Sequence, residues 1–264
     1  IPYIKKEMLE NFQLTILEKD AQISVLHRIK TTLNYIDEMI KNYENEILEI
    51  KKFFNSYLIK SFTNIDKISD RKTLKEISDT FGRGKSKHRP RGDKKLFGDK
   101  IPFIQTGDIA NAQKYLKNYT KMYNDFGIKQ SKIWKRRTVC ITIAANIAEL
   151  AILDIDACFP DSVIGIVPNK KITSSEYLYF LLKYFQTYIK SKSKGTAQLN
   201  INLGTFENER FPFPRSLDVQ DDIVNKIDKI NNYTLDYINL KYQKINELNI
   251  LKSSVIDNEI NKAA

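Results

Sequence analysis

The chain has 264 residues, of which 42% are hydrophobic and 11% aromatic, a composition that can build a buried core and argues against disorder. Its formal net charge of +11 implies an anionic partner, either nucleic acid or a membrane surface, unless the surplus only reflects a generally basic protein rich in Lys, Asn and Ile. No apolar run approaches 18 residues, so we expect no membrane span.

Cysteine and histidine are too few and too scattered to suggest a metal site. Cys140 and Cys158 each lie beside apolar residues, and we expect buried free thiols at both positions. No CxxC pair occurs, and His27 and His88 are far apart, which argues against zinc. Low cysteine use suits a reducing compartment, and no signal peptide is recognisable after Ile1, so we expect a cytoplasmic protein.

The first predicted element is a long helix between Gln22 and Phe62, because apolar residues recur there with spacings that alternate between three and four. No Gly or Pro interrupts this segment, which at 1.5 Å per residue gives a helix of roughly 60 Å. A helix of this kind needs a partner to cover its apolar stripe. The stripe consists of Leu26, Ile29, Leu33, Ile36, Ile40, Tyr43, Ile47, Ile50, Phe54 and Tyr57.

The middle of the chain, residues 63–217, is predicted to be a mixed α/β domain with a twisted sheet. It is punctuated by Gly, Pro and Asp, and its short apolar runs are typical of strands. These runs cover residues 101–104, 138–143, 151–153 and 162–167. One amphipathic helix is predicted over Ser174–Lys190, where Ser174 can cap the N-terminus and Glu176 suits the first turn.

A second long helix is predicted from Asp221 to about Asn258, after Pro212 and Pro214, which end any helix from upstream. Its length matches the first helix, so the two pair most simply as an antiparallel coiled coil within one chain. Pairing of each helix with another molecule is the alternative. The expected fold class is α+β, a mixed α/β domain plus two long helices. The second stripe consists of Ile223, Ile227, Ile230, Leu235, Ile238, Tyr242, Ile245, Leu248, Leu251 and Val255.

An internal repeat relates the two ends of the chain. Leu9–Ile23 and Phe206–Gln220 share a Glu-Asn pair and a later Asp-x-Gln, and each segment ends where a long helix begins. The unit formed by the end of a domain and a following helix therefore occurs twice. We interpret residues 1–17 as the tail of a preceding domain, 18–62 as the first helix, 63–217 as the domain and 218–264 as the second helix.

Three segments in this order resemble the specificity subunits of type I restriction-modification systems, the HsdS family. Ile101–Ile109 (IPFIQTGDI) resembles the segment near the start of each recognition domain, and Lys194–Ile201 (KGTAQLNI) resembles a loop near its end. Phe211–Ile223 resembles the Pro-rich entrance to the spacer helix. The chain departs from the pattern there, because Arg215 replaces the second Pro and Val219 replaces the usual Glu. Gln22 and Gln220 keep the register of the two copies.

The resemblance implies a subunit without an active site of its own. Residues 63–217 would be one target-recognition domain, which reads one half of a bipartite duplex-DNA target, and the helices would be spacers. Methylation subunits would dock on the assembly and motor-nuclease restriction subunits would join it. S-adenosylmethionine, ATP and magnesium would be bound by those partners, and this chain would need no cofactor. The tail at residues 1–17 favours a truncated subunit over a natural half-subunit, which would form a homodimer.

The basic segment Gly82–Lys95 is the first candidate for DNA contact. Its glycines and Pro90 predict a flexible loop that could follow a groove, with arginines reading guanine and lysines touching phosphates. A solvated surface loop is the alternative. The candidate residues are Arg83, Lys85, Lys87, His88, Arg89, Arg91 and Lys94.

The second candidate is the stretch 190–202, where Gln and Asn could pair with adenine or could instead satisfy the backbone of an irregular loop. Its candidate residues are Lys192, Lys194, Thr196, Gln198 and Asn200. Gln105 and Thr106 form a third candidate, next to Asp108, which we expect to be a turn or cap residue. Trp134 could face DNA with the basic residues after it, or could be a core aromatic beside a basic rim.

Catalytic patterns are incomplete. Gly84-Lys85-Ser86 mimics the end of a phosphate-binding loop, but Asp79 stands where its first Gly is required. Asp93-Lys94-Lys95 has no convincing partner acid upstream for a nuclease site. We therefore expect a DNA-binding, non-catalytic protein. The alternative is a coiled-coil interaction protein whose basic domain binds RNA or protein, and preference for duplex DNA over RNA and single strands would distinguish the two.

Overall fold

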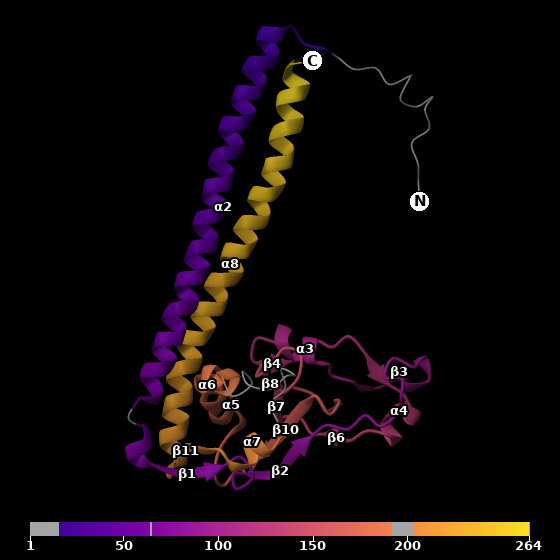
Figure 1. Cartoon of the computed structure of the whole chain (residues 1–264). Coiled ribbons are helices and arrows are strands. Elements are labelled where there is room, and N and C mark those ends of the chain that lie inside the picture. The colour runs from indigo at the N-terminus through magenta and orange to yellow at the C-terminus, as the bar shows by residue number, and fades with distance from the viewer. Residues whose placement is uncertain (1–15, 64, 192–202, 264) are drawn as a thin grey trace. The chain divides into compact units, whose positions relative to one another are not determined.

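The computed structural model describes residues 16–63, 65–191 and 203–263 (Figure 1). The chain divides into two compact units, each with its own internal packing. The first unit lies within Ile1–Phe54 and Asn231–Ala264, and the second is Asn55–Ile230. Helices α2 (Lys19–Phe62) and α8 (Leu217–Ala263) both extend from the first unit into the second.

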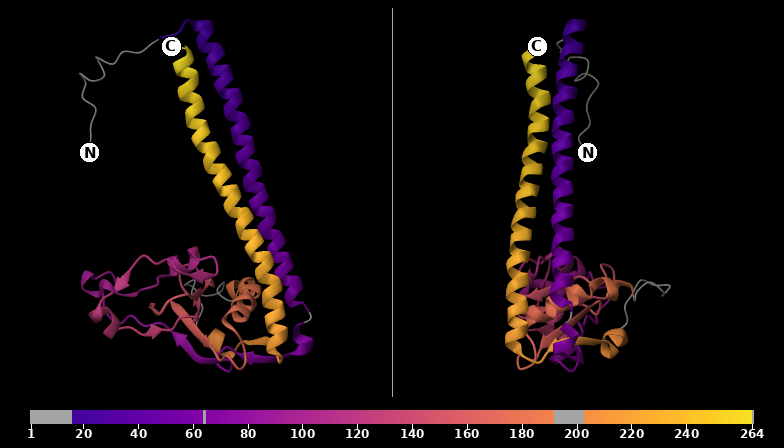
Figure 2. Two further views of the ribbon diagram at one scale, coloured as in Figure 1. Left: turned by 180° about the vertical axis from the view of Figure 1, so that it is seen from behind. Right: turned by 90° about the vertical axis from the view of Figure 1, so that its left-hand side faces the viewer.

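In the first unit, α2 and α8 lie side by side and antiparallel, as both views of Figure 2 show. Ion pairs join Glu46 to Lys241 at 2.6 Å, Asp37 to Lys252 at 2.5 Å and Arg28 to Glu259 at 2.8 Å. The residue numbers fall along α2 as they rise along α8, which sets the antiparallel register. The predicted pairing of two helices within one chain is therefore confirmed.

The buried positions of the helix pair follow the predicted spacing, with three exceptions. Ile36, Ile47 and Ile238 are buried, as the heptad pattern requires. Leu26 is exposed and Val25 is buried in its place, while Tyr242 and Leu251 of α8 are exposed as well. Leu251 follows two successive spacings of three, where the pattern departs from the alternation of three and four. Tyr242 is exposed although the spacing around it is regular.

The second unit is organised around a five-stranded sheet in the order β2-β10-β7-β8-β4. All neighbours are antiparallel except β4 and β8, which are parallel. The strands are β2 (Ser78–Arg83), β10 (Val163–Pro168), β7 (Val139–Thr142), β8 (Leu150–Leu153) and β4 (Tyr115–Leu116). Three of the four predicted apolar runs are these central strands, and they are buried on both faces because helices and loops cover the sheet.

Three two-stranded pairs surround the sheet. They are β1 (Ser69–Thr73) with β11 (Arg210–Pro214), β3 (Phe97–Pro102) with β5 (Met122–Tyr123), and β6 (Ile133–Trp134) with β9 (Ala157–Cys158). The short helices are η1 (Ile65–Ile68), η2 (Lys94–Leu96), α3 (Thr106–Asn111), α4 (Asp125–Lys129) and α7 (Leu203–Asn208). The predicted run 101–104 begins inside β3 and continues beyond it.

The predicted helix over Ser174–Lys190 is divided into α5 (Ser175–Tyr184) and α6 (Gln186–Ser191). Ser174 caps α5, because its hydroxyl oxygen accepts a hydrogen bond from the Tyr177 amide at 3.1 Å. The division falls at Phe185, whose ring packs edge-on against Phe211 of β11 with centroids 5.2 Å apart. The sequence periodicity continues across this position, so it did not reveal the division.

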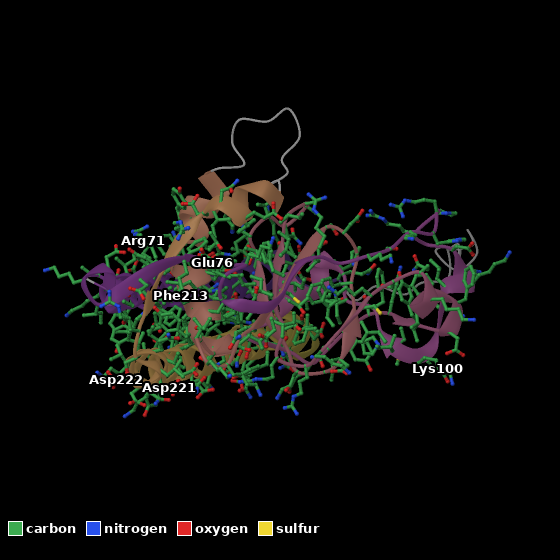
Figure 3. All side chains as sticks on the ribbon, turned by 90° about the horizontal axis from the view of Figure 1, so that it is seen from below. Arg71, Glu76, Lys100, Phe213, Asp221 and Asp222 are labelled. Atoms are coloured by element: carbon green, nitrogen blue, oxygen red, sulfur yellow. The ribbon has the colours of Figure 1, made fainter. Side chains whose placement is uncertain are left out.

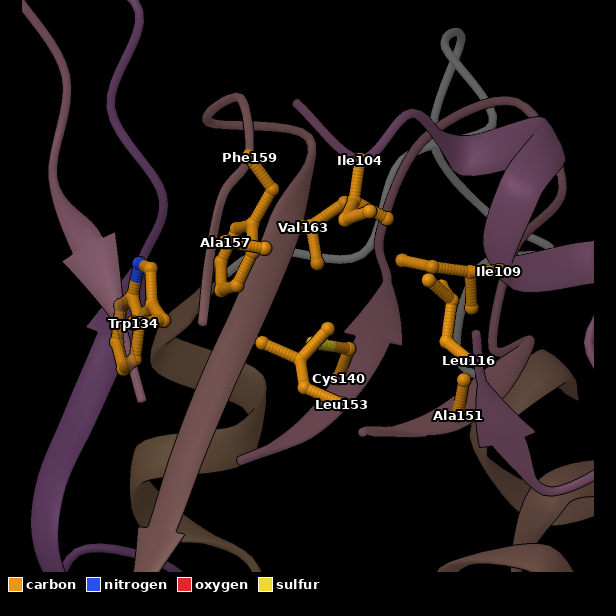
Figure 4. Packing of buried hydrophobic residues seen from close by; sticks show 10 residues of the cluster. All are labelled: Ile104, Ile109, Leu116, Trp134, Cys140, Ala151, Leu153, Ala157, Phe159 and Val163. Carbon is orange, nitrogen blue, oxygen red and sulfur yellow. The ribbon is translucent and has the colours of Figure 1, made fainter. Parts of the chain in front are cut away.

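One hydrophobic cluster of the second unit joins buried side chains of the sheet strands to those of the neighbouring short strands and loops (Figure 4). Trp134 stacks on Phe159 with ring centroids 5.0 Å apart, and Gly165 of β10 makes room for both rings. Cys140 and Cys158 are buried free thiols, as predicted. Their burial raises the thiol pKa values, so neither cysteine is a ready nucleophile.

The N-terminal end of α8 is fixed to the domain by buried polar contacts. The side-chain nitrogen Nε2 of Gln220 donates to the carbonyl oxygens of Ile172, at 2.8 Å, and Pro214, at 2.9 Å. About two helical turns later, Asp228 forms an ion pair with Lys114, which is largely buried. The Gln220 contacts hold the beginning of the helix against β11 and the loop after β10, and the Asp228–Lys114 pair holds it beside β4.

Candidate nucleic-acid interface

The basic segment Gly82–Lys95 leaves the sheet at the end of β2 and reaches η2. Its beginning is tied to the turn between β9 and β10, because the Gly84 amide donates to the Val163 carbonyl at 2.8 Å and the Lys85 amide donates to the Phe159 carbonyl at 2.9 Å. The chains approach closely there, since a Cβ at Gly84 would lie 2.2 Å from the Phe159 carbonyl oxygen. Only glycine fits at this position.

A second set of contacts holds the middle of the segment against α4 and the residues that follow it. The side-chain oxygen of Gln130 accepts hydrogen bonds from the amides of Lys87, at 2.6 Å, and His88, at 3.0 Å. The Ser131 hydroxyl donates to the Lys85 carbonyl at 2.6 Å. The segment is a loop, as predicted, and hydrogen bonds from Gln130 and Ser131, which lie more than 40 residues away in the sequence, hold its backbone.

The cationic side chains of this ordered segment point into solvent. All of the arginines and lysines between 83 and 95 are exposed, namely Arg83, Lys85, Lys87, Arg89, Arg91, Lys94 and Lys95. A fixed backbone with seven exposed cations presents a dense positive surface to an anionic partner. Lys100 of β3 lies at one end of the second unit, while Arg71, Glu76 and Phe213 lie at the other end (Figure 3).

His88 differs from its neighbours because it is turned into the segment. Its Nε2 lies 2.8 Å from an Asp93 carboxylate oxygen, and its ring meets Phe126 edge-on with centroids 5.5 Å apart. Asp93 also accepts a hydrogen bond from the Lys95 amide at 3.0 Å. This amide and then His88 hold the pKa of Asp93 below its ordinary value, so the carboxylate stays charged and closes the loop.

The two arginines in the middle of the segment have defined partners. Arg89 Nη1 donates to the carbonyl oxygens of Ser86, at 2.7 Å, and His88, at 2.9 Å. Arg91 Nη2 forms an ion pair with Asp161 at 2.5 Å. Sequence reasoning missed Asp161 as a site residue, because 70 residues separate it from Arg91.

Gln105 and Thr106 lie at the beginning of α3, away from the basic segment in sequence. The Gln105 amide donates to an Asp108 carboxylate oxygen at 2.8 Å, so Asp108 is a cap residue, as predicted. The Gln105 side-chain nitrogen lies 3.4 Å from the Thr120 hydroxyl. Part of the hydrogen-bonding capacity of Gln105 is thus used within the protein. The candidates Lys192, Lys194, Thr196, Gln198 and Asn200 lie outside the described residues.

Trp134 is a core aromatic beside a basic rim and does not face the surface, so the alternative that its ring faces DNA is wrong. Its ring is 1% exposed, and Lys132 Nζ lies 3.8 Å from the ring centroid. The basic residues that follow are paired with acids: Lys135 with Asp156, Arg136 with Asp154 and Arg137 with Glu176. This rim is therefore close to neutral, unlike the basic segment.

Across the ranges that the structure describes, no cluster of His, Cys, Asp and Glu has the geometry of a metal site. None of the described helices combines the length and apolar character of a membrane span. Residues 67–248 match the family model of the type I restriction modification DNA specificity domain.

The chain is similar to the type I restriction enzyme HindI specificity subunit of Haemophilus influenzae, with 29% identity over 121 residues. That match covers 44% of this chain and 26% of the relative. The matched part of the chain therefore spans about a quarter of the curated relative's length.

Three solved structures share the fold, at identities too low to show more than fold. A chain from the structure reported as "Structural basis underlying complex assembly and conformational transition of the type I R-M system" has a TM-score of 0.72 at 16% identity, over 90% of this chain and 58% of that one. The HsdS subunit from Thermoanaerobacter tengcongensis gives 0.58 at 14% identity, over 100% and 64%. The type I S subunit from M. genitalium gives 0.54 at 18% identity, over 92% and 61%.

Proposed function

Since the chain belongs to the type I restriction modification DNA specificity domain family, we propose that it binds duplex DNA with sequence specificity through one recognition domain, residues 63–217. The observation that carries this proposal is the ordered basic segment, with seven exposed cations on a backbone held by Gln130, Ser131 and the turn before β10. Order matters because base readout needs side chains at defined positions, whereas a mobile cationic tail supports only non-specific binding.

Within this surface, the chemistry divides by residue type. The guanidinium groups of Arg83, Arg89 and Arg91 can each donate two hydrogen bonds to guanine O6 and N7 in the major groove. The ammonium groups of the lysines contact phosphates without reading sequence, and each contact releases a counterion. His88 contributes by supporting the loop through Asp93, and Gln105 and Thr106 would add a second contact region beside α3.

We further propose that this chain reads one half of a bipartite target, and that the paired helices α2 and α8 set the distance to the other half. Their polar faces would scaffold methylation subunits and, through them, restriction subunits. On this proposal, methyl transfer, ATP hydrolysis and cleavage take place in those partners, which would bind S-adenosylmethionine, ATP and magnesium. This chain would contribute no catalytic group and would work in the cytoplasm.

Selection from a randomised duplex library tests the proposal, with the purified chain alone and together with its methylation subunit. About 150 mM salt keeps non-specific binding weak. Enrichment of a short block of about three to five base pairs would support one recognition domain, and two blocks at a fixed spacing would indicate a homodimer. Failure to enrich any block in either condition, with equal binding to RNA, would instead support a coiled-coil interaction protein with a basic RNA- or protein-binding domain.

A further inference from the structure

An acidic side chain, Asp161, lies within the cationic surface of the basic segment. It occupies the turn between β9 and β10, and it contacts two arginines from a different part of the sequence. One carboxylate oxygen lies 2.5 Å from Arg91 Nη2, and the other lies 4.0 Å from Arg89 Nη2. The three side chains are partly exposed, so the pair of arginines stays accessible from solvent.

The position of Asp161 is fixed by the backbone on both sides of it. The Val163 amide donates to the Pro160 carbonyl at 3.1 Å, and the Ile143 amide donates to the Ser162 carbonyl at 3.0 Å. Phe159, two residues before, is fully buried. The turn thus belongs to the rigid sheet, while the long arginine side chains that it contacts have several rotatable bonds. Asp161 can therefore fix the arginines, rather than the reverse.

Stability does not explain this arrangement. Ion pairs between exposed side chains contribute little to folding, because both charges lose hydration and rotamer freedom when they pair. On a surface that binds DNA, a carboxylate also repels phosphates and lowers non-specific affinity. The carboxylate does, however, fix the orientation of the guanidinium group that it contacts. An arginine that uses one N–H group on a carboxylate keeps its remaining donors in a fixed plane for a base edge.

We propose that Asp161 is a positioning residue for sequence readout, which holds the guanidinium group of Arg91 in the orientation that pairs with guanine and adds a weaker charge contact to Arg89, whose own hydrogen bonds go to the carbonyls of Ser86 and His88. The inference rests on the proposed function, since it assumes that these arginines read bases. It adds a specificity determinant that acts through the arginines and lowers binding to wrong sequences by its own negative charge.

The test compares the unchanged 264-residue chain with Asp161→Asn on the selected duplex and on a scrambled duplex, across a range of salt concentrations. Loss of the carboxylate should strengthen binding to the scrambled duplex and steepen the salt dependence of log K by up to about one unit. The ratio of specific to non-specific affinity should fall by about tenfold, the discrimination that one well-oriented bidentate contact supplies. Asp161→Glu keeps the charge and should restore part of the ratio.

Asp70→Asn is the matched control. Asp70 is 42% exposed against 43% for Asp161, and it forms an ion pair with Arg215 at 2.8 Å. It lies in β1, next to Arg71, at the end of the second unit away from Lys100 (Figure 3). This variant removes the same charge and a similar ion pair, and its affinity ratio should stay within about twofold of wild type.

The outcomes separate the inference from the proposed function. If the wild-type chain prefers the selected duplex and Asp161→Asn keeps that preference, or if Asp70→Asn lowers the ratio equally, the positioning role is overturned and the proposed function stands. A wild-type chain without any sequence preference would overturn both. Thermal unfolding of each variant, measured alongside, should show Tm values within about 2 °C of wild type, because exposed ion pairs contribute little.

Discussion

The Thr173 hydroxyl donates a hydrogen bond to the side-chain oxygen of Gln220 at 2.8 Å, and both side chains are buried. With its two bonds to backbone carbonyls, Gln220 uses its full amide group to join three segments: the loop before α5, the end of β11 and the first turn of α8. The sequence repeat contains the same residue at Gln22, where the side chain donates to the Leu17 carbonyl at 2.6 Å on an exposed surface.

This pair of glutamines gives the first prediction. Gln220→Ala leaves the buried Thr173 hydroxyl, the buried Pro214 carbonyl and the part-buried Ile172 carbonyl without this partner, so it should lower the free energy of unfolding by about 3 kcal/mol. Gln22→Ala removes a similar hydrogen bond in an exposed setting and should cost less than about 0.5 kcal/mol. Urea unfolding of both variants measures the difference. Equal losses would mean that Gln220 is not the anchor of α8.

Close packing at Gly165 gives the second prediction. A Cβ at this position would lie 2.6 Å from the Trp134 ring and 2.7 Å from the Phe159 ring. Because both rings are buried and stacked, Gly165→Ala should destabilise the second unit by about 2 kcal/mol or more. Gly107→Ala is the control, since a Cβ there meets nothing within 4 Å and the residue lies in α3, where alanine is favoured. An unchanged free energy of unfolding in Gly165→Ala would contradict the close approach of Gly165 to the Trp134 and Phe159 rings.

The arginines of the basic segment give the third prediction. Replacing Arg83, Arg89 and Arg91 together by alanine removes the side chains proposed to donate to base edges. The affinity for the selected duplex should fall at least tenfold, and the preference for it over a scrambled duplex should disappear. A variant with Lys75, Lys170 and Lys171 replaced by alanine removes the same charge from exposed positions elsewhere in the second unit. It should weaken binding to every sequence without changing the preference. Loss of preference in both variants would show that charge alone matters.

Lys94 gives a fourth prediction with a different signature. Its exposed ammonium group is a point charge suited to phosphate. Lys94→Ala should therefore lower the affinity for the selected duplex and for the scrambled duplex by the same factor. The slope of log K against log salt should become shallower by about one unit. Fluorescence anisotropy at several salt concentrations measures both quantities. A change in preference at constant slope would place Lys94 on a base edge instead.

The long helices could be predicted from the sequence because helical periodicity depends only on residues close together in the chain. Alternating spacings of three and four predicted a helix from Gln22, and α2 begins at Lys19 and ends at Phe62, as predicted. Sheet order was not predictable, since β10 inserts between β2 and β7 through pairings of distant segments. Asp161 was missed for the same reason. Composition marked the basic segment, but its order depends on Gln130 and Ser131, which no local pattern connects to it.

The last prediction concerns pH and the helix pair. Glu46 of α2 accepts hydrogen bonds from Lys241 and, at 2.5 Å, from the Tyr237 hydroxyl, both of α8. These hydrogen bonds, with Lys241 the larger cause, hold the pKa of Glu46 below its usual 4.5. A carboxyl group with a lowered pKa stabilises the folded state above its unfolded pKa, and that contribution disappears as pH falls through the folded value.

The difference in stability between wild type and Glu46→Gln should therefore be constant near neutral pH and shrink towards zero below pH 4.5, as the wild-type carboxylate is protonated. Glu49→Gln is the control, because Glu49 pairs with Lys52 of its own helix at 2.8 Å and does not join α2 to α8. Its effect should be smaller at every pH. Chemical denaturation from pH 2 to 7 measures both variants. A Glu46→Gln effect that does not change over this range would mean that the contact between α2 and α8 at Glu46 contributes no stability through its charge.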